Sequence, residues 1–302
     1  MGNVGFLFSG QGDQYPGMGL DLYQREKEAK EVFERLEKIR TGNKKQCFEG
    51  SEEELKHTAN TQPCLFTVEM AIARVVEKYY KPTAVAGFSL GEVVAATYSG
   101  LFNLETGFSL VMERGSLMER DGSSVNASMA AIVKLDDDTV KEIASSFNKI
   151  YAVNFNCPGQ VTVSGIVDEM PLFYEKVKEA GGRAIPLKVS GVFHSPFMTK
   201  ASEDFRKLLL KTEIQKPNID LYSNFTSLKY DAVKDYDEVT LLSKQISKAV
   251  LWEKLIKNMI LDGITTFIEI GPGKTLTNMV KKIDGSVVAL TYREALDGVM
   301  QC

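Results

Sequence analysis

Histidine is scarce in this 302-residue sequence, which contains only two, and the four cysteines form no CxxC pair. Cys47, Cys64, Cys157 and Cys302 lie far apart, and neither histidine is near a cysteine in sequence. Zinc sites and disulfide-built folds usually show closely spaced ligands or paired cysteines. The sequence therefore predicts reduced thiols, no metal site and a cytoplasmic location.

The sequence also lacks a basic excess and a long apolar run. Lys and Arg number 36 against 40 Asp and Glu, which gives a net charge of −4 and a pI near 5.5. Proteins dedicated to nucleic acids usually carry a basic excess, so no nucleic-acid partner is expected. No apolar run reaches the roughly 18 residues that a membrane-spanning helix needs, so no membrane partner is expected either.

Apolar and charged residues make up 44% and 25% of the chain, a composition typical of globular proteins. The length suggests one large domain or two modest ones. Apolar segments alternate with helical patterns, which predicts the α/β class. Strands are expected at 4–8, 83–88, 219–222, 265–270 and 287–292, and helices at 21–40, after Pro63, at 90–100, 105–120 and 197–212, near 238–260 and after Gly273.

The segment 129–190 has a rhythm of its own. Strands are expected at 129–135, 150–155, 160–166 and 184–190, with helices at 137–147 and 168–180. The order β-α-β-β-α-β is that of the ferredoxin-like unit. This segment is therefore predicted to be a small domain inserted into a larger α/β domain.

The sharpest motif is Gly87-Phe88-Ser89-Leu90-Gly91, a G-x-S-x-G pattern between a predicted strand and a predicted helix. In that context the pattern is typical of a nucleophile elbow, in which glycines allow a sharp turn and the serine projects above the sheet. The helix that follows directs backbone N–H groups and the positive end of its dipole toward the same point. Ser89 is therefore the candidate nucleophile.

A serine hydroxyl needs a base that accepts its proton. His57 lies in the polar stretch EEELKHTANTQ and is expected at the surface. His194, in SGVFHSPFM, follows the last strand of the inserted unit, at a junction where pockets form, and is the candidate base. The spacing of acidic residues identifies no third member of a triad.

Three weaker signals remain. The glycine-flanked loop 10–12 follows the first strand and could bring a second backbone N–H toward the serine. Arg114, on a predicted helix, would ordinarily be solvated, but an arginine can hold a substrate carboxylate through paired hydrogen bonds. The segment 271–275 resembles a phosphate-binding loop, but that motif needs glycine where the chain has Ile268, so a strand-to-helix turn is the better interpretation.

Taken in order, these segments resemble the malonyl-CoA:acyl carrier protein transacylases from end to end. The motifs are FLFSGQGDQYPGMG, GFSLGE, the arginine of MERGSLM, NCPGQVTVSG, GVFHSPFM and IEIGPGKTL. The resemblance implies an α/β-hydrolase-like core formed by 1–127 and 194–302, with a ferredoxin-like subdomain at 128–193. The active site would lie in the cleft between them.

The resemblance also implies roles for individual residues. Ser89 would accept the acyl group and His194 would be its base. A backbone carbonyl at Gln245 would orient the histidine in place of an acid. The backbone N–H groups of Gln11 and Leu90 would form the oxyanion hole.

Three further positions bear on the substrate. Arg114 would bind the malonyl carboxylate. Phe193, directly before the histidine, resembles the malonyl-selective form, whereas enzymes for branched methylmalonyl groups usually carry a smaller residue there. Phe88 departs from the family, in which histidine commonly precedes the nucleophile, and it would make that wall of the site apolar.

The resemblance implies transfer of malonyl from malonyl-CoA to the phosphopantetheine thiol of an acyl carrier protein, for fatty acid synthesis. A monomer without a cofactor is expected. Arg183 and Lys188 are candidates for contact with the acidic carrier protein by position alone. The alternatives are a stand-alone acyltransferase of a polyketide synthase, a serine hydrolase with the same acyl-enzyme, and a non-catalytic scaffold.

Overall fold

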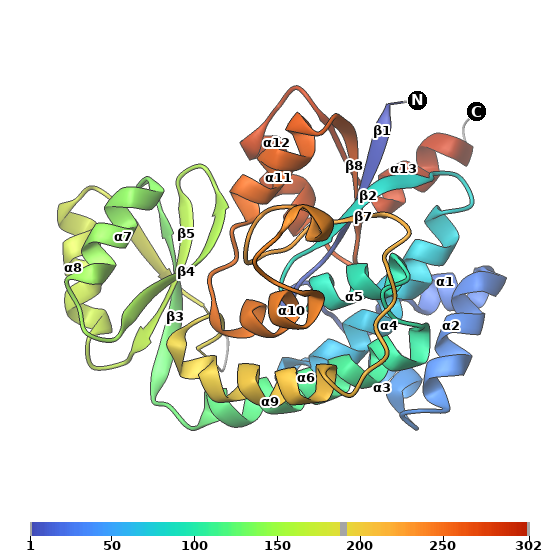
Figure 1. Cartoon of the computed structure of the whole chain (residues 1–302), viewed down its shortest axis with the longest axis horizontal. Helices are drawn as coiled ribbons and strands as arrows, with labels where there is room; N and C mark the ends of the chain where they lie inside the picture. The colour runs from blue at the N-terminus through green and yellow to red at the C-terminus, as the bar shows by residue number, and fades with distance from the viewer. Residues whose placement is uncertain (1, 188–191, 301–302) are drawn as a thin grey trace.

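Two β-sheets organise the chain. The structure, a computed structural model, describes residues 2–187 and 192–300. One sheet is parallel, with strand order β7-β2-β1-β8-β9, and the other is antiparallel, with order β4-β5-β3-β6. In Figure 1 the antiparallel sheet and its helices α7 and α8 form the left part of the molecule, and the parallel sheet lies on the right. The fold is therefore mixed α/β, as the sequence predicts.

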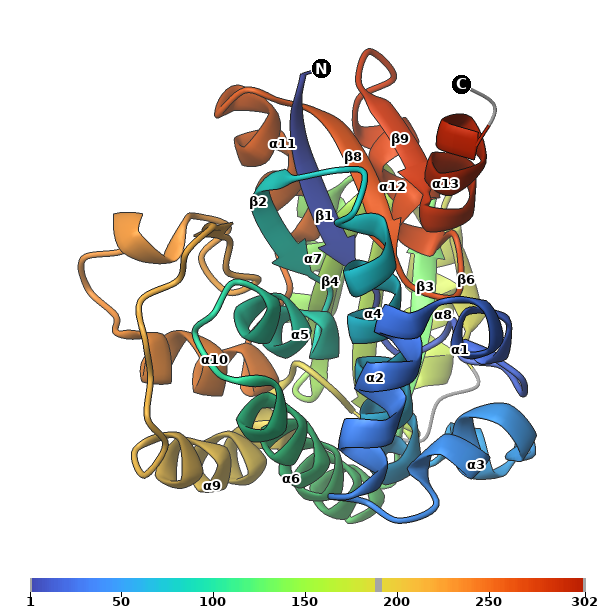
Figure 2. The ribbon, with the colours of Figure 1, turned by 90° about the vertical axis from the view of Figure 1, so that its right-hand side faces the viewer.

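The parallel sheet is covered on both faces, and this explains the nearly continuous apolar runs of its central strands. Phe6, Phe8 and Ile268 belong to a core shared with helices α4, α5 and α6, whereas Leu7 and Phe267 belong to a core shared with α11 and α12. Figure 2 shows β2, β1, β8 and β9 side by side. The strands are β1 (Asn3–Phe8), β2 (Pro82–Gly87), β7 (Asp220–Leu221), β8 (Ile264–Ile270) and β9 (Val288–Thr291).

Helices that precede or follow these strands build the rest of this part. They are α1 (Leu20–Arg25), α2 (Lys27–Glu37), α3 (Asn43–Glu49), α4 (Thr58–Val76), α5 (Leu90–Tyr98), α6 (Leu104–Ser123), α9 (Thr199–Leu209), α10 (Glu238–Ser247), α11 (Trp252–Leu261), α12 (Thr275–Ile283) and α13 (Tyr292–Met300). Short 3-10 helices occur at η1 (Glu54–Lys56), η2 (Pro196–Met198) and η3 (Tyr230–Ala232).

The antiparallel part has the element order predicted from its sequence. It consists of β3 (Ala127–Val133), α7 (Asp137–Ser145), β4 (Ile150–Cys157), β5 (Gln160–Ile166), α8 (Met170–Glu179) and β6 (Arg183–Pro186). Val140 of α7 and Phe173 of α8 pack with Ile132, Val161 and Val163 of the strands in a separate core. Both helices therefore cover one face of this sheet, as Figure 1 shows.

The two parts are joined by backbone hydrogen bonds beside α11. Phe155 N donates to Val250 O at 2.9 Å, and Val250 N donates to Val153 O at 2.9 Å. Asn154 and Val250 thereby form a parallel bridge that extends β4 toward the segment between α10 and α11. This bridge fixes the antiparallel sheet against the part of the chain that carries Gln245.

Some predicted boundaries are wrong. The single helix expected at 21–40 is divided into α1 and α2, because Glu26 is extended (φ −115°, ψ 121°), and Ile39, expected on its buried stripe, is 38% exposed. A salt bridge of 2.8 Å joins Lys78 to Glu26 at this break, and no local glycine or proline signals it. Helix α4 begins at Thr58 and contains Pro63, which was expected before its start. Helix α3 begins at Asn43, where the sequence predicts only the end of the preceding helix.

Some sequence predictions fall on parts of the chain that are not described. Lys188, Cys302 and the end of the strand expected at 184–190 lie outside the described residues. No helix in residues 2–187 or 192–300 combines the length and apolar character that crossing a membrane requires.

The turn between β2 and α5 depends on the two glycines of the motif. A Cβ atom on Gly87 would lie 1.9 Å from the carbonyl carbon of Gly91, and one on Gly91 would lie 2.3 Å from Phe8 O. Both contacts are with backbone, which cannot move aside as a flexible side chain can. Gly87 is therefore required by close packing of the turn on the start of α5, and Gly91 by close packing of the turn on the end of β1.

This packing predicts the effect of adding one methyl group. Gly91→Ala should lower the free energy of unfolding by about 3 kcal/mol, because the turn must shift away from β1. Gly285→Ala is the control, since a Cβ there meets no atom closer than 4.0 Å, and it should change stability by less than about 0.5 kcal/mol. Urea denaturation measures both variants. Equal stability of the two would contradict the packing argument.

Candidate active site

Ser89 lies at the sharp turn between β2 and α5, as its motif predicts. Its backbone has φ 55° and ψ −107°, a conformation that residues with side chains seldom adopt and that costs roughly 1–3 kcal/mol. The Ser89 N–H donates to Asn224 Oδ1 at 2.8 Å, and the Ser89 carbonyl accepts from Gln245 Nε2. Side chains from two distant segments thus hold the turn.

His194 lies within hydrogen-bond distance of the candidate nucleophile. Its Nε2 is 2.8 Å from Ser89 Oγ, and its Nδ1 is 2.8 Å from the backbone carbonyl oxygen of Gln245. A carbonyl oxygen only accepts hydrogen bonds, so Nδ1 carries the ring proton and Nε2 is free to accept one from Ser89. The structure thus brings together the two residues that the sequence paired and orients the ring through the carbonyl of Gln245.

The imidazole is 4% exposed, and its surroundings keep it neutral. Burial lowers the pKa of His194 to about 3, and the positive charge of Arg114 acts in the same direction. The hydrogen bond to the Gln245 carbonyl opposes the shift without reversing it. Near neutral pH the ring is therefore unprotonated and able to accept a proton.

Arg114 is fully buried on α6, although an arginine on a helix is ordinarily solvated. Its guanidinium donates to Gln62 Oε1 at 2.9 Å, to Gln245 Oε1 at 2.8 Å and to Ser89 Oγ at 3.2 Å. The buried Nε has no hydrogen-bond partner in the described part of the chain. Burial lowers the pKa of Arg114 to about 10, which leaves it charged at neutral pH.

The hydrogen-bond partners of Arg114 are neutral amides and a hydroxyl, so none of them cancels its charge. Glu92 is close enough to influence its pKa, but the two side chains share no hydrogen bond among those of the described residues. A guanidinium that is buried and oriented but not paired with a carboxylate attracts an anionic group strongly, because the low dielectric around it weakens screening.

Gln245 contributes three contacts at once. Its backbone carbonyl binds His194, its side-chain oxygen accepts from Arg114, and its side-chain nitrogen donates to the Ser89 carbonyl. The family resemblance predicts only the first of these, at this position. The two side-chain contacts link the candidate nucleophile, base and cation through one residue near the end of α10.

The expected oxyanion-hole residues flank the turn. Leu90 is the first residue of α5 and is buried, so its N–H lies at the helix N-terminus. Gln11 follows β1, and its side chain donates to Thr58 Oγ1 at 3.4 Å. A Cβ atom on Gly10 would lie 2.9 Å from Phe88 O, so the loop that contains Gln11 is packed against the turn.

The two phenylalanines beside the motif residues are both packed. Phe193 is 8% exposed and belongs to the main core. The Phe88 ring meets the Trp252 ring edge to face at a centroid distance of 5.4 Å. The residue that departs from the family pattern therefore packs against α11, in the core on the other face of the parallel sheet.

The other predictions for histidine and cysteine concern residues away from this site. His57 is exposed at the surface, as predicted, with Nδ1 3.0 Å from Glu119 Oε1. Cys47, Cys64 and Cys157 are buried and unpaired. Within residues 2–187 and 192–300, no three His, Cys, Asp or Glu side chains come together as a metal site.

The 271–275 segment connects β8 to α12, as the turn interpretation predicts.

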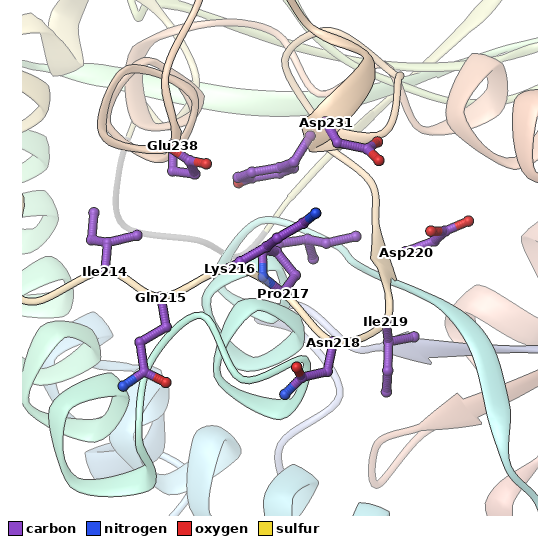
Figure 3. Close-up of a pocket in the computed structure, with 11 residues that line it drawn as sticks. Ile214, Gln215, Lys216, Pro217, Asn218, Ile219, Asp220, Asp231 and Glu238 are labelled. Atoms are coloured by element: carbon purple, nitrogen blue, oxygen red, sulfur yellow. The ribbon is translucent and has the colours of Figure 1, made fainter.

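A cavity of about 610 Å³ lies away from these groups. It is lined by the segment 214–221 on one side and by Tyr230, Asp231 and Glu238 on the other. Figure 3 shows Ile214 to Asp220 facing Asp231 and Glu238 across this space. None of the expected site residues lines it. Tyr230, which lines the cavity, is its connection to the candidate site, since the Tyr230 hydroxyl donates to Glu92 Oε1 at 2.7 Å.

Sequence reasoning missed three residues that support the site: Gln62, Glu92 and Asn224. Gln62 binds Arg114, and Asn224 binds the Ser89 backbone. The carboxyl group of Glu92 is fully buried, and burial raises its pKa to about 7. One local signal was available, because Glu92 is the only charged residue in the apolar helix α5. Asn224 follows the carboxyl end of a parallel strand, where functional side chains gather.

Comparison with known proteins agrees with this geometry. The family model described as an acyl transferase domain matches residues 5–295. A malonyl CoA-acyl carrier protein transacylase of Bacillus subtilis (strain 168) is 36% identical over 310 residues, covering 100% of this chain and 97% of that protein. The chain belongs to the malonyl-CoA:acyl carrier protein transacylase family. The resemblance inferred from six motifs is thereby confirmed.

Two further relatives extend the match in this transacylase family. A malonyl CoA-acyl carrier protein transacylase of Clostridium perfringens has a crystal structure that superposes with a TM-score of 0.94 at 36% identity, covering 99% of this chain and 96% of that one. A polyketide biosynthesis malonyl CoA-acyl carrier protein transacylase of Bacillus subtilis (strain 168) is 32% identical, covering 95% of this chain and 99% of that protein. The mixed α/β fold with one parallel and one antiparallel sheet is thus the fold of this family.

The neutral buried His194 predicts a loss of stability in acid. The pKa of His194 is about 3 in the folded protein against 6.5 for an ordinary histidine, so below pH 6.5 the unfolded chain takes up a proton that the folded chain does not. This favours unfolding as the pH falls from 6.5 toward 3, by about 2 kcal/mol at pH 5. The carboxyl of Glu92, whose pKa is raised to about 7 by burial, acts in the opposite direction over the same pH range. His194→Gln should therefore make the free energy of unfolding increase relative to wild type as the pH falls from 7 to 5, measured by urea denaturation.

His57→Gln is the matched control for that measurement, since it removes the other histidine, which is exposed and lies away from the site. The absolute stability of each variant does not matter here, because only the change with pH is compared. Equal slopes for wild type and His194→Gln would contradict a neutral buried histidine.

Proposed function

We propose that this chain transfers a malonyl group from malonyl-CoA to the phosphopantetheine thiol of an acyl carrier protein, through an ester on Ser89. The observation that carries the proposal is the buried guanidinium of Arg114, held by neutral glutamines with one nitrogen 3.2 Å from Ser89 Oγ. A cation at that distance binds an acyl group that ends in a carboxylate while its thioester carbonyl meets the hydroxyl. The names of the relatives support the same activity.

Acylation starts when malonyl-CoA binds with its carboxylate on Arg114. His194 Nε2 takes the proton of Ser89 Oγ, and Oγ attacks the thioester carbonyl carbon. The oxyanion that forms accepts hydrogen bonds from the backbone N–H groups of Gln11 and Leu90, each contributing roughly 3 kcal/mol to lowering the barrier. The C–S bond then breaks, and coenzyme A leaves with the proton from His194.

Deacylation repeats these steps with another nucleophile. The phosphopantetheine thiol of the carrier protein gives its proton to His194 and attacks the malonyl ester, and Ser89 recovers its proton as the ester bond breaks. Coenzyme A leaves before the carrier protein reacts, so the kinetics are ping-pong. The reaction needs no cofactor, because the substrate is already an activated thioester and the histidine transfers the proton.

The substrate also improves the base. The charge of Arg114 is the second cause of the low pKa of His194, after burial. A carboxylate bound to the guanidinium offsets that charge, so the pKa of His194 rises toward its ordinary value when malonyl is present. A more basic imidazole accepts the Ser89 proton more readily. Phe193 narrows the site beside the histidine and disfavours branched methylmalonyl groups.

We further propose that the fold divides into an α/β-hydrolase-like domain, 1–127 and 194–302, and an inserted ferredoxin-like subdomain, 128–193. The strand order β4-β5-β3-β6 and the intervening helices α7 and α8 support this division. Malonyl-CoA and the carrier protein would be the partners of a cytoplasmic monomer that binds neither nucleic acid nor a membrane. Because the relatives include a polyketide biosynthesis enzyme, the malonyl group would supply fatty acid or polyketide synthesis.

Intact mass spectrometry after brief incubation with malonyl-CoA tests this function directly. Wild type should gain the mass of one malonyl group and lose it on addition of holo acyl carrier protein. Ser89→Ala should gain none, since it lacks the accepting oxygen. Release of free malonate without transfer to the carrier protein would instead indicate a hydrolase.

The carboxylate-binding role of Arg114 predicts a change of substrate preference. Arg114→Ala should lower kcat/KM for malonyl-CoA roughly a hundredfold, which corresponds to about 3 kcal/mol for a lost buried ion pair. Activity with acetyl-CoA should fall much less, because acetyl has no carboxylate to lose its partner. The ratio of kcat/KM for the two thioesters is the measurement, with thermal melting as the check on folding. An unchanged ratio would contradict the role.

A further inference from the structure

The Ser89 backbone is held by more than the turn itself. Ser89 precedes the first residue of α5, so its N–H has no partner within that helix, and it donates instead to Asn224 Oδ1 at 2.8 Å. Asn224 is separated from Ser89 by 135 residues and follows β7, the strand next to β2. The turn therefore depends on a residue that its own sequence motif does not include.

Asn224 makes a second contact with the same turn. Its Nδ2 donates to the carbonyl oxygen of Gly87 at 2.6 Å. One amide thus binds the residues on both sides of Phe88, accepting from one and donating to the other. An amide is a small planar side-chain group that offers both an acceptor and a donor. Its oxygen therefore suits the Ser89 N–H, and its nitrogen suits the Gly87 carbonyl.

Asn224 is itself fixed in place. It is fully buried, its N–H donates to Glu92 Oε2 at 3.1 Å, and its carbonyl accepts from Leu251 N at 2.9 Å. The other oxygen of Glu92 accepts from the hydroxyl of Tyr230 at 2.7 Å. Glu92 lies in the first turn of α5, the helix that follows Ser89. The contacts therefore form a closed loop, in which Ser89 binds Asn224, Asn224 binds Glu92, and α5 connects Glu92 to Ser89.

We propose that Asn224 is a positioning residue for acyl transfer, which sets the Ser89 backbone so that Oγ meets both His194 and Arg114. The substrate named in this inference rests on the proposed function, whereas the hydrogen bonds of Asn224 do not depend on it. The distances from Ser89 Oγ to His194 Nε2 and to the Arg114 guanidinium, 2.8 and 3.2 Å, exist only while the turn stays in its strained form. Loss of the amide leaves the Ser89 N–H and the Gly87 carbonyl buried without this partner.

Asn224→Ala tests the proposal by separating chemistry from binding. The rate constant for acylation by malonyl-CoA should fall about a hundredfold, the effect of displacing a reacting group by about 1 Å. KM for malonyl-CoA and the malonyl-to-acetyl ratio should stay within about twofold of wild type, because Arg114 keeps its glutamine partners. Labelling of Ser89 by a small fluorophosphonate, which needs no carboxylate site, should slow by a similar factor.

Asn43→Ala is the matched control, since Asn43 is also fully buried and lies away from the site, where its Oδ1 accepts from Arg40 and its Nδ2 donates to Thr67 Oγ1. It should melt at a lower temperature and acylate at the wild-type rate. An equal loss of acylation in both variants would show a general effect of destabilisation and would overturn the proposal.

Asn224→Asp decides the question if the alanine variant does not fold. It keeps the volume and the acceptor for Ser89 N–H but replaces the donor to Gly87 O with an oxygen, so acylation should slow at least about tenfold. Acylation at the wild-type rate would overturn the proposal. If wild type reacts with the fluorophosphonate but forms no malonyl ester, the proposed function fails while the labelling rates still test the role of Asn224.

Discussion

The strained turn at Ser89 is the constraint on which the rest of the site depends. Two glycines allow this turn, because a Cβ atom on Gly87 would strike the backbone of Gly91 and one on Gly91 would strike the backbone at the end of β1. The Ser89 carbonyl accepts from Glu92 N at the start of α5, and side chains from two other segments also bind its N–H and its carbonyl. The energy of these buried hydrogen bonds offsets the roughly 1–3 kcal/mol of backbone strain. In this conformation Ser89 Oγ lies within hydrogen-bond distance of both His194 and Arg114.

The charge of Arg114 and the neutral state of His194 depend on the buried groups around them. Arg114 is charged in a site from which water is largely excluded, and its hydrogen-bond partners are neutral. The same charge helps to keep His194 unprotonated, and nearby Glu92 partly compensates it. A carboxylate in direct contact with the guanidinium would have removed its affinity for an anion. Glutamines at positions 62 and 245 orient the cation without neutralising it, which is why amides suit these positions better than acids.

The joint between the two sheets contributes to the same geometry. Val250 pairs with β4 only five residues after Gln245, and the N–H of His194 donates to Ile246 O at 3.1 Å. The end of α10 is therefore tied to the antiparallel sheet on one side and to the histidine on the other. Because Gln245 also binds Ser89 and Arg114, the relative position of the two parts of the chain and the alignment of the site are set by one short segment.

The sequence by itself determined the fold class, the strand–turn–helix around Ser89, the β-α-β-β-α-β order of residues 127–186 and the exposure of His57. Each follows from local periodicity or from a motif within a few residues. It could not determine the break at Glu26, where a distant lysine binds, or the burial of Arg114, which looks like any helical arginine. The side-chain contacts of Gln62, Glu92 and Asn224 also depended on the tertiary structure, because they join residues 52 to 138 positions apart. Hydrogen bonds over such separations leave no periodic signal, and only the packed chain brings their donors and acceptors together.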